Sequence, residues 1–345
     1  ELINKYGADA LRAGLLVIAP QGLDILFSED KIEHGRNFMN KLWNSARFVT
    51  MNLDETPPPK LNELDNDVLD DIDHWILSKL NETIKEVDDS YSSYKINEAI
   101  KKVYDFIWND FCDWYIEFVK TRFYGDNKED RIIAQSVSIH VIREILKLLH
   151  PYCPFITEEL WSHFKMEKEN MLINANWPQF ESNRINKDIE DDIQLLMNSI
   201  SAIRNMRSSL NVSPAKEADL IIRGNKNTCA KLEKNIAYLQ KLAKLNEIII
   251  GENQEKPMQS STAVIKGLEL FLPLVGLIDI NKEVDRLKKQ IADLNGRLSS
   301  VNNKLNNKNF VARAPENVIN HERDKQKNYE NDLAKLQKNI GSLQG

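Results

Sequence analysis

Apolar residues recur at helical spacing along most of the first 180 positions, most clearly around residues 36–49. Spacings of three and four separate Met39, Leu42, Ala46, Val49 and Leu53, which predicts a helix with one buried stripe. Ser28, Glu29 and Asp30 form a typical start for it. At 100° per residue, the opposite face collects Asn37, Asn40, Lys41, Asn44 and Arg47, with Phe48 among them.

The same spacing predicts further helices over 68–90, 94–124 and 129–149. A Pro-rich connector, "DETPPPKLNELD", precedes them, and the Pro-bounded turn in "HPYCPFITEELWSHF" leads into a shorter helix. We therefore expect an antiparallel bundle of about five helices over 35–180. Its core would be filled by Trp75, Trp108, Phe111, Trp114, Tyr115, Phe118, Phe155 and Trp161.

The pattern changes after residue 187. A helical stretch is followed by short β-branched runs at 220–222, 248–250 and 264–272, with another helix expected around 227–245 between the first two runs. This alternation predicts a small α+β module over 187–277.

Residues 279–345 carry heptad spacing, which predicts a coiled coil. The first seam contains Ile280, Val284, Leu287, Ile291, Leu294, Leu298, Val301 and Leu305. After a polar connector and Pro315, a second seam contains Tyr329, Leu333, Leu336, Ile340 and Leu343. Two such arms predict an antiparallel coiled-coil hairpin, and the fold class as a whole is mainly α.

Charge and composition narrow the class of protein. The net charge is −6, yet residues 281–345 hold 13 Lys and Arg against 8 Asp and Glu, so a polyanion would be attracted to the end of the chain. The apolar runs are shorter than the roughly 20 residues that span a bilayer, so we expect no membrane segment. Three cysteines far apart in sequence, without a C-x-x-C pair, fit small buried residues in a reducing cytoplasm.

Catalytic residues are not predicted. The six histidines lie singly on helical patterns, and neither a G-x-S-x-G motif nor a P-loop is present. We expect no catalytic, metal or cofactor site in these 345 residues.

Two surfaces have both a binding and a structural interpretation. The polar face of the 36–49 helix suits single-stranded RNA, because amides and Arg read base edges and Phe48 would stack on a base; alternatively, a neighbouring helix covers part of it and Phe48 is core. The hairpin is either a stalk or dimer interface, or a basic rod that contacts phosphates. Its cations are Arg286, Lys288, Lys289, Arg297, Lys304, Lys308 and Arg313.

Several long motifs carry a family resemblance: "KYGADALR", "SEDKIEHGRNFMNKLWNSARFV", "FCDWYIEFVK" and "HPYCPFITEELW". In this order they resemble the post-catalytic part of class I aminoacyl-tRNA synthetases for branched aliphatic amino acids. The ending, from "GLIDINKEVDRLKKQIADLNGRL" to "KNFVARAPENVINHERDK", resembles the C-terminal coiled coil of the valyl-tRNA synthetase family. The isoleucine enzyme would instead be expected to end in a cysteine-ligated zinc module.

The resemblance implies a tRNA(Val)-binding part with an anticodon-binding bundle and a tRNA-binding arm, preceded over 1–34 by the remnant of a stem-contact region. It suggests tRNA contacts by Arg36, Asn37, Lys41, Asn44 and Arg47 in the bundle, although these residues could equally face the domain joining the bundle to the catalytic body. In the hairpin it suggests Arg286, Lys289, Arg297 and Arg313.

The class I signatures, H-x-G-H and K-M-S-K-S, are absent, and the chain opens without Met. We expect a cytoplasmic, monomeric chain cut from a longer polypeptide and inactive alone, with its catalytic domain in cis. ATP and Mg²⁺ are implied only for the parent enzyme. The alternative is a coiled-coil scaffold or dimerisation module without RNA selectivity.

Overall fold

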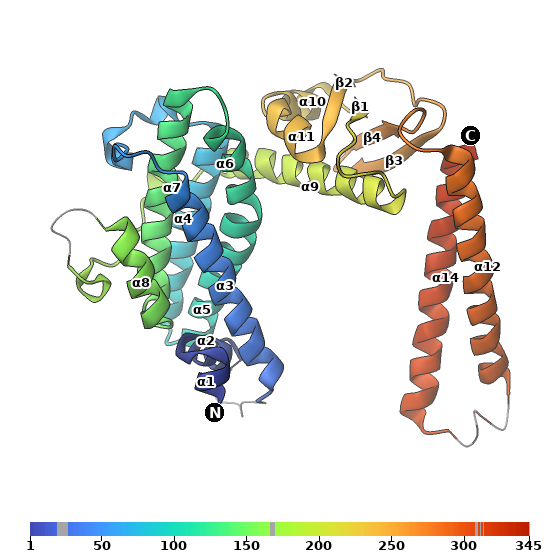
Figure 1. The fold of residues 1–345 in the computed structure, drawn as a ribbon, viewed down its shortest axis with the longest axis horizontal. Helices are drawn as coiled ribbons and strands as arrows, with labels where there is room; N and C mark the ends of the chain where they lie inside the picture. Colours follow the sequence, from blue (N-terminus) through green and yellow to red (C-terminus); the bar gives the residue numbers. More distant parts are fainter. Residues whose placement is uncertain (19–26, 166–169, 308–309, 311, 313, 345) are drawn as a thin grey trace. The chain divides into compact units, whose positions relative to one another are not determined.

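The computed structural model describes residues 1–18, 27–165, 170–307, 310, 312 and 314–344. Two compact units share the chain, Glu1–Gln194 and Leu195–Gly345. Both are visible in Figure 1 and are described here separately. The described residues include no helix long and apolar enough to cross a bilayer.

The first unit is helical. It contains α1 (Leu2–Tyr6), α2 (Ala8–Ile18), α3 (Glu29–Met51), α4 (Asp71–Ser92), α5 (Ile96–Asp105), α6 (Ile116–Phe123), α7 (Lys128–Leu149) and α8 (Pro154–Phe164). The ten-residue π-helical stretch η3 (Phe106–Tyr115) joins α5 to α6. The predicted helices over 68–90, 94–124 and 129–149 are confirmed within three residues. Short 3₁₀ turns lie at Leu61–Glu63, Asn66–Val68, Leu172–Asn174 and Ser182–Arg184.

Burial of aromatic and aliphatic side chains holds this bundle together. Trp75, Phe111, Tyr115, Phe118 and Trp161 are almost fully buried, as the aromatic pattern predicted. Trp108 and Trp114, which were also predicted as core residues, are only half-buried, and Phe155 is 66% exposed at the start of α8. Pro154 occupies the first turn of that helix, where its fixed φ is favourable.

A buried ion cluster fixes three helices of the bundle. The guanidinium of Arg122 in α6 lies 2.7 Å from carboxylates of Asp73 in α4 and Asp130 in α7, and 3.5 Å from Asp70. Burial raises the pKa of Asp73 to about 7, an effect that the Coulomb repulsion of Asp70 adds to and that Arg122 opposes. This cluster therefore links α4, α6 and α7 within the bundle, and its role is structural.

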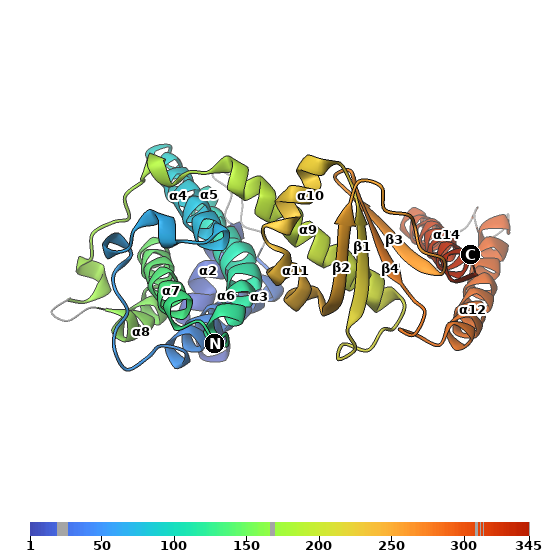
Figure 2. The same cartoon turned by 90° about the horizontal axis from the view of Figure 1, so that it is seen from above.

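The second unit begins within α9 (Lys187–Ser209) and contains a four-stranded sheet in the order β2-β1-β4-β3. Its strands are β1 (Ala218–Arg223), β2 (Leu245–Gly251), β3 (Ser260–Ile265) and β4 (Leu268–Pro273). β1 pairs in parallel with β2 and antiparallel with β4. Figures 1 and 2 show α9 running along one side of this sheet.

Two predictions for the module were wrong in detail. Residues 264–272 form two strands, because Lys266 and Gly267 have φ of 43° and 83° and make the tight turn of a β-hairpin. The helix expected around 227–245 is divided into α10 (Lys226–Glu233) and α11 (Ile236–Ala243). The α+β character itself is confirmed.

The predicted hairpin is formed by α12 (Ile280–Asn306) and α14 (Glu316–Gln344), which lie side by side in Figure 1. Val284, Leu287, Val301, Leu333 and Leu343 are its buried seam residues. The Gln326 amide also donates to Asn302 Oδ1 across the seam at 2.8 Å, a polar contact that fixes the register of the two arms. The seam is thus closed within the chain.

Candidate nucleic-acid interface

One face of α3 is open to solvent. Asp and Glu in the first turn favour the N-terminus of this helix, and its inner stripe buries Phe38, Leu42, Ala46 and Val49. The remaining surface of α3 carries exposed amides, an indole and a guanidinium. We call these five residues the α3 strip: Asn37, Asn40, Trp43, Asn44 and Arg47. Within the described residues Arg47 forms no ion pair, so its charge faces outward.

Trp43 is the aromatic residue of this strip, with 37% of its surface exposed. Of the two sequence interpretations of Phe48, stacking on a base or packing under a neighbouring helix, the contacts support the second. Phe48 is half-buried, because its ring packs 5.9 Å from Phe123 and 6.4 Å from Tyr124, with the Lys120 ammonium 5.6 Å away. The helical phase of residue 43, between Asn40 and Arg47, was the signal that could have identified Trp43.

The two remaining candidates on α3 have protein partners. The Lys41 ammonium lies 2.6 Å from Asp113 and 3.7 Å from the centre of the Trp108 ring. Arg36 pairs with Glu33 at 2.7 Å and lies over the Tyr6 ring at 5.5 Å. Asn37, Asn44 and Arg47 are therefore more accessible to a ligand than Lys41 and Arg36.

The hairpin presents its candidates outside the apolar seam. Arg297 pairs with Asp293 on the same helix at 2.9 Å, and both side chains are more than half exposed. Arg286 pairs with Glu283, whereas Lys289 is exposed. Arg313 lies outside the described residues, as does Lys308.

Glu322 places a negative charge within the hairpin. Its carboxylate lies 3.5 Å from Lys304 on the facing arm and 3.0 Å from Lys325 on its own arm. The hydrogen bond from Lys325 lowers the pKa of Glu322, and Lys304 adds to the effect. Both lysines therefore share the charge of Glu322, although their own side chains remain exposed.

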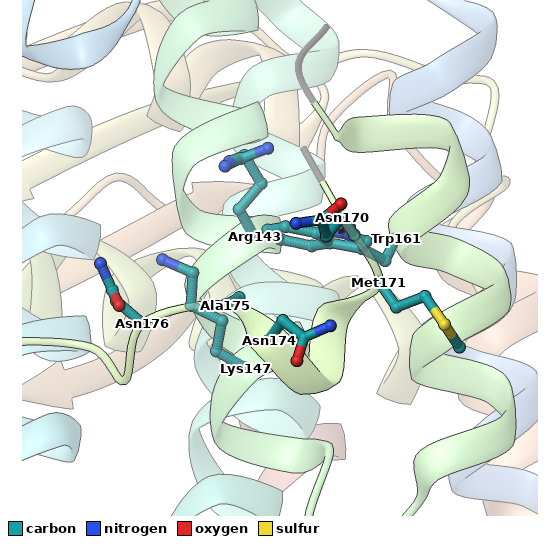
Figure 3. Close-up of a pocket in the computed structure, with 8 residues that line it drawn as sticks. All are labelled: Arg143, Lys147, Trp161, Asn170, Met171, Asn174, Ala175 and Asn176. Atoms are coloured by element: carbon teal, nitrogen blue, oxygen red, sulfur yellow. Dashed lines mark hydrogen bonds between the residues drawn. The ribbon is translucent and has the colours of Figure 1, made fainter. Parts of the chain in front are cut away.

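The bundle also has a polar pocket of about 320 Å³ beside α7 and α8. Figure 3 shows Arg143, Trp161 and Asn170 gathered together, with Met171 directed away from them. The Arg143 guanidinium lies 4.4 Å from the Trp161 ring centre and donates to the Phe164 carbonyl at 2.7 Å. None of the tRNA-binding residues suggested from the sequence lines this pocket, whereas Trp161, predicted as a core residue, does.

The titratable groups do not form a metal cluster in the described part of the chain. Cys112, Cys153 and Cys229 are buried free thiols, which confirms their interpretation as small core residues. Burial raises the pKa of the Cys112 thiol to about 11, so it is protonated at neutral pH.

Two family models match parts of the chain, and the second of them includes the hairpin, whereas α3 lies before both matches. Residues 73–222 match the family model described as the anticodon-binding domain of tRNA ligase, and residues 279–344 match the valyl tRNA synthetase tRNA binding arm. The class is therefore that of the aminoacyl-tRNA synthetases.

Whole-chain relatives give the family. The chain is 39% identical over 344 residues to a valine–tRNA ligase of Clostridium acetobutylicum, covering 99% of the chain and 39% of the relative. A Listeria monocytogenes valine–tRNA ligase is 39% identical over 345 residues, with the same coverage of both chains, and one from Bacillus subtilis is 37% identical over 347 residues, covering 100% of the chain and 39% of the relative. The chain belongs to the valine–tRNA ligase family, and it spans about two fifths of the length of these relatives.

Proposed function

We propose that this chain is the tRNA-binding C-terminal part of a valine–tRNA ligase and that its partner is tRNA(Val). One observation carries the proposal: an anticodon-binding domain and a valyl-type tRNA-binding arm occur in one chain that aligns along 99% of its length with valine–tRNA ligases. In the full protein it would serve the ATP- and Mg²⁺-dependent attachment of valine to tRNA in the cytoplasm.

The geometry supports a division of labour between the two surfaces. The α3 strip offers amides, Trp43 and Arg47, which suit hydrogen bonds to base edges and stacking in an anticodon loop. The hairpin offers outward cations on α12, which suit phosphates at the outer corner where the D and T loops of a tRNA meet. Base contacts specify a sequence, whereas phosphate contacts position the RNA.

The chain alone is proposed to be inactive in aminoacylation and monomeric. The class I signature motifs do not occur in its 345 residues. The apolar seam, which motivated the alternative of a dimerisation module, is used between α12 and α14 of one chain. Sedimentation at increasing concentration would restore that alternative if it revealed a dimer sensitive to Leu287→Asn.

A binding titration tests the proposal. Labelled tRNA(Val) and a tRNA with a different anticodon are each titrated with the 345-residue chain, and valine attachment is assayed in parallel with ATP and Mg²⁺. We expect binding that favours tRNA(Val) and no attachment. Equal affinity for both RNAs would leave only nonspecific phosphate contacts, and attachment of valine would refute the proposed inactivity.

A further inference from the structure

A groove surrounds the loop that follows α9. Its lining comes from the end of the region matched by the anticodon-binding family model, from the matched tRNA-binding arm and from residues 242–244 between them. One hollow, of about 480 Å³, lies between this loop and the foot of the hairpin. Another, of about 570 Å³, lies between the loop and the end of α11. Both hollows are lined by Ser208 and Asn211, so they adjoin around the loop.

The groove is rich in cations. Six basic side chains and two carboxylates line it: Arg204, Arg207, Lys244, Arg286, Arg297 and Lys335, with Asp293 and Asp332. Three serines and an asparagine add neutral donors: Ser208, Ser209, Ser213 and Asn211. This combination of positive charge and neutral donors suits a phosphate backbone.

Arg207 gives the groove a buried positive charge. Only 6% of its surface is exposed, and its guanidinium donates to the carbonyl oxygens of Lys244 and Ser213 at 3.1 and 3.2 Å, and to that of Lys216. Within the described residues it has no carboxylate partner. Because a charge in a low-dielectric interior is weakly screened, Arg207 contributes positive potential at the groove floor while it fixes the loop.

Two cations at the rim are accessible. The Nε of Arg204 donates to the Leu242 carbonyl at 3.0 Å, which orients the exposed guanidinium along the rim. Lys244 is exposed in a left-handed conformation, with φ of 55°, at the end of α11. Neither residue forms an ion pair with another described residue, so each is accessible to a phosphate.

On the hairpin side, two of the three cations have weak competitors, whereas Arg286 is held by the buried Glu283. Arg297–Asp293 and Lys335–Asp332 are ion pairs of 2.9 and 3.3 Å between side chains that are more than half exposed. Exposed pairs contribute little free energy, so a phosphate oxygen would replace either carboxylate at small cost. Arg297 and Lys335 are therefore available to an entering polyanion.

We propose that this groove binds the sugar-phosphate backbone of RNA and extends the contact surface of the hairpin onto the end of α9 and the end of α11. The inference rests on the proposed tRNA binding and gives the α+β module a role in it. An acidic protein is a poorer match, because protein interfaces are anchored by buried aromatic residues. Within the described residues, no aromatic side chain lines either hollow.

Charge-neutral variants of the whole chain test the groove. The groove variant carries Arg204→Gln and Lys244→Gln, which remove two rim cations and leave Arg207 and the loop in place. The control carries Lys226→Gln and Lys256→Gln. These two exposed lysines follow the C-terminal ends of β1 and β2, whereas the groove lies at the N-terminal ends of the same strands. Both variants lose the same charge, so a difference between them reflects position. Binding to tRNA(Val) is measured by fluorescence anisotropy over a range of salt concentrations.

We expect the groove variant to bind about 10-fold more weakly at ~0.1 M salt. Its slope of log affinity against log salt should be shallower by roughly 1.5, because each phosphate contact contributes roughly 0.7–0.9. The affinity of the control variant for tRNA(Val) should be within about twofold of the wild-type affinity. If both variants lose affinity equally, or if the groove variant binds as tightly as the wild type, the groove is not an RNA-binding site. A wild-type chain that binds no tRNA overturns the proposed function and this inference with it.

Discussion

The bundle and the hairpin differ in how much of each is core. The bundle buries large aromatic side chains from five helical segments, and ion pairs of Arg122 link α4, α6 and α7. The hairpin buries a single narrow seam and exposes nearly all its charges. The bundle can therefore present a rigid surface of amides and an indole, whereas the hairpin presents charge on a slender support. Binding by the first should depend on shape and stacking, and binding by the second on salt.

Replacement of Arg122 should produce the largest of the predicted effects, a loss of stability confined to the bundle. In the Arg122→Met variant, Asp73 would remain buried without its cation, and breaking such a pair typically costs about 3–5 kcal/mol. All six tryptophans lie in the first unit, so urea unfolding followed by tryptophan fluorescence reports on the bundle. The Arg297→Gln variant should be within about 0.5 kcal/mol of wild type by the same measurement.

A smaller effect is expected at Asp110, which lies in the π-helical stretch. Burial raises its pKa to about 6, Glu190 and Glu82 add to the rise, and Lys79 opposes it. Because the folded state holds this proton more tightly, wild-type stability should fall as pH rises from ~4 through ~6. Asp110→Asn should therefore stabilise the chain by about 1–3 kcal/mol at pH ~8 and by little at pH ~4.

The control for this experiment is Asp126→Asn, at an exposed position between α6 and α7. Urea unfolding is measured at both pH values for the two variants. A gain from Asp110→Asn of the same size at both pH values would contradict the raised pKa.

Replacement of Trp43 separates stacking from charge. Trp43→Ala should lower tRNA affinity by about 1–3 kcal/mol, the usual contribution of one stacked base. The salt slope should be unchanged, because no cation is lost. Phe155→Ala, which removes another exposed aromatic side chain of the bundle, is the matched control. Loss of affinity in both variants would indicate a general effect on the bundle.

The smallest effect is expected from the hairpin cations. Arg297→Gln with Arg313→Gln should weaken tRNA binding a few-fold and reduce the salt slope by roughly 1.5, since neither position belongs to the apolar seam. Circular dichroism should show unchanged helicity. Unchanged affinity and slope would refute the role given to the hairpin as a basic rod.

Local periodicity accounts for what could be predicted. The bundle helices and both hairpin arms follow from spacings of three and four, and the polar face of α3 follows from the same geometry. The division of residues 264–272 into two strands depended on one Lys-Gly turn, which a run of β-branched and aliphatic residues concealed.

Contacts between distant segments account for most of what was missed. Lys41 is engaged because Asp113 and Trp108 come from a helix about 70 residues later in the chain. The groove is formed from the end of α9, the end of α11 and the hairpin, and nothing in the spacing of its cations along the sequence joins them.

Chemical footprinting of tRNA(Val) in complex with the chain tests the central claim most directly. Bound chain should protect the anticodon loop and the outer corner where the D and T loops meet, with additional backbone protection from the groove. The Trp43→Ala variant should lose only the loop protection. Uniform weak protection, or none at either end of the RNA, would contradict the account.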